Sequence, residues 1–179
     1  MKVPLDKSHR KALSFQDYSP QPTLDGVWVQ PLKKHRALEG DFMEYLRLTN
    51  GVVENLPAPF ALRQVSLSRA QAGRINAFHL HPKQVQDEFW TVIDGTMMVW
   101  LADVRASSPT RNAKRRYLLS AEEPVLLYIP AGVAHGYKAG PGGAMLLYAM
   151  NDQFNIKDPN EGRLPWDHFG RDIWEEDRG

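Results

Sequence analysis

The sequence has no cysteine, no apolar run of transmembrane length and no long block of charge of one sign. The lack of cysteine excludes disulfides, thiolate nucleophiles and sulfur-ligated metal sites, and it fits a reducing compartment such as the cytoplasm. The N-terminus lacks the apolar segment of a signal peptide. The net charge is +1, and the basic cluster at Lys114–Arg116 is too short to form a nucleic-acid groove. We therefore expect a cytoplasmic protein that binds neither nucleic acid nor membranes.

What the chain does contain is a series of short apolar segments separated by turn residues. At 179 residues with 42% hydrophobic residues, it suits a single domain with a substantial core. The segments are rich in Val, Leu, Tyr, Trp and Phe, which is typical of antiparallel strands. Asp94–Gly95 predicts a hairpin turn between two of them, and the glycines at 140–143 predict a loop. These patterns predict an all-β jelly roll with a small-molecule site at its mouth.

The two ends of the chain look different from its middle. Residues 1–25 are polar and contain prolines, which predicts an irregular N-terminal arm before a single domain at 26–179. The tail, from Trp166 to Asp177, predicts one short helix. Because extended arms are often exchanged between protomers, we expect a homodimer.

Two histidine motifs mark the candidate site. Gly73 to Gly95 reads G-x5-H-x-H-x6-E-x6-G, with His79 and His81 on one face of a strand. Pro130–His135 reads P-x-G-x-x-H. Together these resemble the two motifs of the cupin superfamily, although cupins have three or four residues, rather than six, between the second histidine and the glutamate. The resemblance implies a double-stranded β-helix, the cupin jelly roll.

A closer resemblance covers most of the chain. The segments "GVWVQPLKKHRALEGDFMEYL", "INAFHLH", "LLYIPAGVAHGY", "LLYAMN" and "PNEGRLPWD" are similar, in order and spacing, to the dTDP-4-dehydrorhamnose 3,5-epimerase family. That family is dimeric, generally needs no metal and acts on nucleotide-linked 4-keto-6-deoxy sugars. The resemblance implies that His79 is the catalytic base and Tyr148 the acid. The substrate-binding residues we predict are Glu44, Gln64, Asn76, Glu88, His135 and Glu161.

The implied chemistry is coherent. A ketone at C4 acidifies the protons on C3 and C5, and a neutral histidine suits their removal at neutral pH. A tyrosine on the opposite face can return a proton and so invert the carbon. The developing enolate needs a donor near its oxygen, which His135 can help to supply. No cofactor is required.

Several family positions are changed. Glu39, Asn76 and Glu88 stand where the family has cations, and we expect weaker binding of a nucleotide diphosphate as a result. The family also has a C-terminal aspartate that orients its histidine. The candidates here are Asp172, Glu175, Glu176 and Asp177.

The same changes permit a second interpretation. His79, His81, Glu88 and His135 form the three-His-one-Glu set with which metal cupins bind Zn, Mn, Fe or Ni. The protein would then be a metal-dependent dioxygenase or isomerase. The ion would be bound by His79, which could then no longer act as the base. We favour the epimerase, because the long gap before Glu88 argues against its reaching the same centre. A non-catalytic sugar-binding cupin is a third interpretation.

Overall fold

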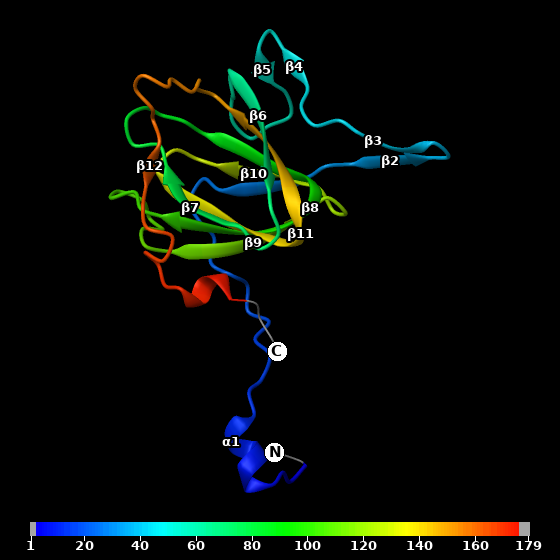
Figure 1. Ribbon diagram of the computed structural model, residues 1–179, viewed down its shortest axis with the longest axis vertical. Helices are drawn as coiled ribbons and strands as arrows, with labels where there is room; N and C mark the ends of the chain where they lie inside the picture. Colours follow the sequence, from blue (N-terminus) through cyan, green and yellow to red (C-terminus); the bar gives the residue numbers. More distant parts are fainter. Residues whose placement is uncertain (1–2, 176–179) are drawn as a thin grey trace.

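The computed structural model describes residues 3–175, and nearly all of its regular structure is β (Figure 1). The prediction of an all-β chain is confirmed. The elements are α1 (Lys7–Ala12), β1 (Trp28–Pro31), β2 (Lys34–Ala37), β3 (Gly40–Met43), β4 (Leu48–Thr49), β5 (Val52–Val53), β6 (Gln64–Ala70), β7 (Ile75–Leu80), β8 (Glu88–Asp103), β9 (Lys114–Ser120), β10 (Val125–Ile129), β11 (Val133–Met150), β12 (Gly162–Arg163) and η1 (Asp172–Trp174).

Two long antiparallel strands, β8 and β11, organise the molecule. The first half of β8 pairs with β10 and with the second half of β11, which in turn pairs with β6. The second half of β8 pairs with β9 and with the first half of β11, which in turn pairs with β7. Each long strand therefore belongs to two sheets: one has β1 and β6 at its edges, and the other has β9 and β12.

Glycines allow both long strands to change sheet without breaking. Gly95 in β8 has a φ of +71°, and a Cβ atom there would lie 2.2 Å from the carbonyl oxygen of Gly143 in β11. The register between the strands shifts between Ala139 and Ala144. The predicted hairpin at Asp94–Gly95 and the predicted loop at 140–143 are thus wrong: these residues are bends inside continuous strands. A glycine with a left-handed backbone conformation is found in β-bulges as well as in turns, so its presence does not distinguish the two.

The core fills the space between the two sheets. Its main cluster includes Trp90, Met97, Val99, Leu127 and Leu146, all nearly or fully buried. β6 alternates half-buried and exposed side chains along most of its length, as expected for a strand with one face in water. A continuous two-sheet core of this kind provides rigid strands on which to build a site.

The ends and one hairpin lie outside this body. The N-terminal arm extends away from the sheets, and its residues Lys7–Ala12 form α1 rather than being irregular (Figure 1). The hairpin β2–β3 also projects from the body. The predicted C-terminal helix is the short 3-10 turn η1, where Trp174 packs into the core. Within residues 3–175, no helix is long and apolar enough to cross a membrane.

Candidate active site

A cavity of about 430 Å³ opens between the strands of the body. Its lining comes from β6, β7, β8 and β11, and from the segment that ends in β12. The predicted site residues that line it are His79, His81, Glu88, His135, Tyr148, Gln64, Asn76 and Glu161. Residues far apart in the sequence are thus brought into one pocket.

Glu44 is the predicted substrate-binding residue that does not reach this cavity. It follows β3 of the projecting hairpin and pairs with Arg47 at 2.8 Å. Its side chain is about half exposed. The hairpin carries Glu44 away from the protomer's own pocket, and the expectation is corrected accordingly: within one protomer, Glu44 lies at the surface.

His79 lies on β7, opposite His135 on β11. Its Nε2 is 2.9 Å from Asn76 Oδ1, and its Nδ1 is 3.5 Å from Glu161 Oε1. Burial, followed by the nearby His135 and Arg163, lowers the pKa of His79 to about 4. The ring is therefore neutral at pH 7, with one nitrogen able to accept a proton.

The carboxylate beside His79 is Glu161, which β12 brings next to β7 through the pairing of Arg163 with His79. Of the C-terminal acids considered from the sequence, Asp172 and Glu175 make no ion pair with His79 in the described part of the chain. Glu176 and Asp177 lie outside the described residues. The sequence predicts Glu161 to be a substrate-binding residue, and in the structure its carboxylate also lies beside His79.

Tyr148 lies near the end of β11, paired with Ser66 of β6 and with Trp90 of β8. It is half-buried in the cavity wall. Burial raises the pKa of Tyr148, so the phenol is protonated at neutral pH. It can donate a proton to a ligand in the same cavity that His79 lines.

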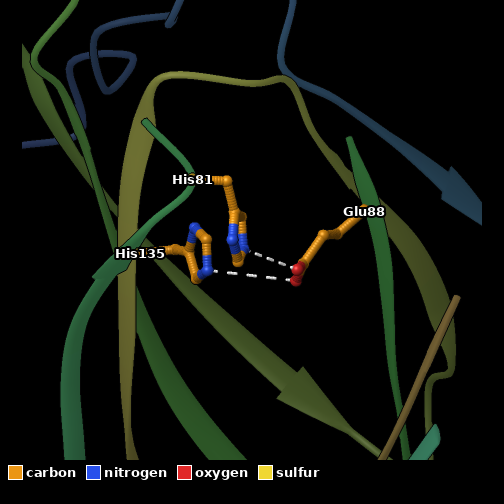
Figure 2. A group of neighbouring side chains, drawn as sticks. All are labelled: His81, Glu88 and His135. Carbon is orange, nitrogen blue, oxygen red and sulfur yellow. Dashed lines mark ion pairs between the residues drawn. The ribbon is translucent and has the colours of Figure 1, made fainter. Parts of the chain in front are cut away.

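His81, Glu88 and His135 converge on one point deeper in the pocket (Figure 2). Nε2 of His81 is 2.8 Å from Glu88 Oε1, and Nε2 of His135 is 3.9 Å from Glu88 Oε2. The argument that a long gap keeps Glu88 from this centre is therefore wrong. Residues 82–85 are exposed, and the backbone N–H of Lys83 in this loop donates a hydrogen bond to Asn160 Oδ1, whereas Gln86 turns back into the cavity wall.

The Glu88 carboxylate is buried but well supplied with donors. Gln86 Nε2 donates to Oε1 at 2.8 Å, and Trp90 Nε1 donates to Oε2 at 2.6 Å. Burial alone would raise the pKa of Glu88, but the hydrogen bond with His81 and the charge of His135 hold it below its usual range. Glu88 is therefore ionised inside the protein.

Arg163 is a functional candidate that the sequence analysis missed. It lines the cavity, its Nη2 donates to Glu161 at 2.6 Å, and its Nη1 donates to Asn76 Oδ1 at 3.4 Å. The signal was its i+2 spacing from Glu161, which puts both side chains on one face of an extended segment. Arg163 places a cation next to Asn76 in the cavity wall.

Comparison with known proteins decides the family. The sequence pattern of the dTDP-4-dehydrorhamnose 3,5-epimerases matches residues 21–173. The chain belongs to the dTDP-4-dehydrorhamnose 3,5-epimerase family. It is 37% identical over 145 residues to the spore coat polysaccharide biosynthesis protein SpsL of Bacillus subtilis, covering 80% of this chain and 91% of SpsL. The predicted membership is confirmed, and with it the class of carbohydrate isomerases.

A more distant sequence relative and a solved structure agree with this result. A dTDP-4-dehydrorhamnose 3,5-epimerase of Mycobacterium tuberculosis is 26% identical over 133 residues, which is 73% of this chain and 64% of that protein. The crystal structure of ChmJ, a 3'-monoepimerase from Streptomyces bikiniensis in complex with dTDP-quinovose, superposes with a TM-score of 0.71 at 21% identity. The match covers 86% of this chain and 75% of ChmJ. The predicted cupin jelly roll is thereby confirmed.

Proposed function

We propose that the protein is a nucleotide-sugar epimerase in which His79 is the base and Tyr148 the acid. The observation that carries this proposal is the shared cavity: a neutral histidine, with Asn76 and Glu161 beside its two ring nitrogens, lines the same pocket as a protonated tyrosine. The family membership supports the reaction class.

The chemistry follows from these groups. His79 takes the proton from the carbon next to the ketone, the C–H bond breaks, and its electron pair forms an enolate on O4. Tyr148 then gives its proton to the opposite face of that carbon while the carbonyl re-forms. The carbon is inverted, and the two side chains regain their starting states by exchanging protons with water. We propose that this chain carries out the reaction without a cofactor.

The substrate we propose is a nucleotide-linked 4-keto-deoxy sugar. ChmJ, which shares the fold, was crystallised with dTDP-quinovose. Among the described lysines and arginines, Arg163 is the one that lines the cavity. It can pair with a diphosphate oxygen. Gln64, at the start of β6, also lines the cavity, and its amide can bind sugar hydroxyls.

We also propose that two copies of the chain form a homodimer. The arm exposes Phe15 and Tyr18, and the β2–β3 hairpin exposes Leu38 and Phe42. Large exposed apolar side chains on projecting segments favour contact with a second copy. A cytoplasmic location remains a prediction.

Deuterium exchange tests the reaction class. The protein is incubated in deuterated water with dTDP-4-keto-6-deoxyglucose and related 4-keto sugars, and the C3 and C5 positions are followed by NMR. We expect deuterium to enter C3, C5 or both for at least one sugar. Binding of every sugar without any exchange would instead support the non-catalytic sugar-binding interpretation.

A further inference from the structure

We propose that His81, Glu88 and His135 form a binding site for one divalent transition-metal ion, separate from the base His79. One ligand atom from each residue lies within 4.8 Å of the others. Ligands about 2.0–2.2 Å from an ion stand roughly 3–4 Å apart, which is the spacing needed here. The proposal does not depend on the proposed function, because binding is measured without any sugar.

The first argument is that three electron-pair donors face one another. In a neutral imidazole whose Nδ1 carries the proton, Nε2 is an acceptor, and it cannot bond to a carboxylate oxygen 2.8 Å away. Gln86 Nε2 lies 3.2 Å from His81 Nε2 and 2.8 Å from Glu88 Oε1, and a cation shared between His81 and Glu88 stabilises their contact further. A proton on His81 or a metal ion can be this cation, and a metal ion also binds the third donor, His135.

The second argument is the way in which the two rings are held. Nδ1 of His81 is 2.5 Å from the carbonyl oxygen of Asn160, and Nδ1 of His135 is 3.0 Å from the carbonyl oxygen of Val133. Each carbonyl fixes the proton on Nδ1 and leaves the Nε2 lone pair directed at the shared centre (Figure 2). Metal-binding histidines are typically oriented in this way.

The surroundings of the carboxylate point the same way. Gln86 and Trp90 each donate a hydrogen bond to Glu88, which fixes the carboxylate plane. The Trp90 ring packs edge-on against His135, with ring centroids 5.2 Å apart. All three ligands are thus pre-positioned, and Glu88 and His135 are almost fully buried. Two imidazoles and one carboxylate suit Zn²⁺, Fe²⁺, Mn²⁺ and related ions, with remaining coordination positions for water or a substrate oxygen.

His79 is not part of this centre, in contrast to the four-ligand set considered from the sequence. Its Nε2 contacts Asn76, its Nδ1 faces Glu161, and its ring centroid is 6.1 Å from that of His135. Metal binding and a free base can therefore coexist in one cavity. When bound, a divalent ion would supply positive charge and Lewis acidity in the cavity that His79 also lines.

The test is direct metal binding by the full-length chain. Protein prepared without a histidine tag and stripped with a chelator is titrated with Zn²⁺ by calorimetry and with Co²⁺ by visible absorption. We expect one saturable ion per chain, with Co²⁺ bands of the strength typical of imidazole and carboxylate ligands. The variants His81→Ala, Glu88→Gln and His135→Ala should each weaken binding at least about 100-fold.

Two matched controls make the assignment specific. His79→Asn removes the neighbouring histidine and should keep one ion per chain with little change in affinity. His35→Ala removes an exposed histidine on the β2–β3 hairpin and should have no effect. Circular dichroism shows whether each variant is folded, and Glu88→Gln preserves the side-chain volume. The proposal is overturned by absence of stoichiometric binding to wild type, by unchanged binding to folded Glu88→Gln, or by equal loss in His79→Asn.

Discussion

Glu161 places a carboxylate oxygen 3.5 Å from Nδ1 of His79, on a segment that pairs with the strand of His79 itself. This relationship gives the candidate base an orienting acid from the edge of the sheet. A carboxylate in this position fixes the ring and stabilises the imidazolium that forms when the base takes a proton. Arg163 binds the same carboxylate and holds it in place.

Replacing Glu161 with Gln should therefore slow catalysis more than it weakens binding. We expect kcat to fall about 10- to 100-fold, with KM changed less than about threefold, because the lost interaction is strongest in the transition state. Steady-state kinetics on the sugar identified by deuterium exchange measures both constants. A rise in KM at constant kcat would show that Glu161 only binds substrate.

The bend in β8 depends on Gly95. A methyl group there meets the carbonyl oxygen of Gly143 at 2.2 Å, and the backbone is left-handed. Gly95→Ala should lower the free energy of unfolding by about 2 kcal/mol or more. Gly142, where an added Cβ has nothing within 4 Å, provides the control. Gly142→Ala should change stability by less than about 0.5 kcal/mol, as measured by urea unfolding. Equal effects would contradict this account of the bend.

Asp103 closes the end of β8 with a buried hydrogen-bond network. Its carboxylate accepts hydrogen bonds from Arg105 Nε at 2.9 Å and Thr110 Oγ1 at 2.6 Å, and from Ser108. Burial alone would raise the pKa of Asp103, but the hydrogen bonds from Arg105, Ser108 and Thr110 lower it well below its usual range. Asp103→Asn leaves these donors without a charged partner and should cost about 3 kcal/mol at pH 7.

The same network predicts a pH dependence. Because the folded-state pKa of Asp103 is depressed, its stabilisation is complete above the unfolded-state value of about 3.9 and is lost as the pH falls below it. The stability difference between wild type and Asp103→Asn should therefore be constant from pH 7 to about pH 5 and shrink towards pH 3. Glu123→Gln, at an exposed carboxylate, is the control. A difference that stays constant down to pH 3 would contradict this interpretation.

The proposed homodimer can be tested at the projecting hairpin. Phe42 in β3 is 65% exposed, and Leu118 in β9 is 76% exposed on the main body. Phe42→Asp should shift the mass measured by sedimentation equilibrium from two chains to one, because a charge in an apolar contact is costly. Leu118→Asp should leave it at two. A wild-type protein that sediments with the mass of one chain would contradict the proposed homodimer.

The sequence predicted the all-β architecture and most of the pocket, since strand-like segments and the two histidine motifs are local patterns. It failed where the outcome depends on contacts between distant segments. Asp94–Gly95 has the composition of a turn, and only its packing against Gly143 makes it a bend in a strand. The partnership of Glu161 with His79 requires the pairing of β12 with β7, which no local pattern reveals.

The gap before Glu88 illustrates the same limit. Counting residues suggested that this side chain would miss the centre occupied by His81 and His135. In the structure, the intervening loop is hydrogen-bonded to Asn160 through the backbone N–H of Lys83. Glu88 lies within 4 Å of both histidine rings. The i+2 spacing of Arg163 from Glu161 was the local signal for this residue, but its place beside His79 follows only from the pairing of β12 with β7.

The central claim is that His79 removes the proton next to the ketone. Its most direct test compares wild type, His79→Asn and Tyr148→Phe in deuterated water, following solvent exchange at C3 and C5 of the 4-keto sugar by NMR. The account predicts that His79→Asn loses exchange by about 10³-fold or more. It also predicts that Tyr148→Phe still exchanges the proton but inverts the carbon slowly. Wild-type exchange rates in folded His79→Asn would contradict it.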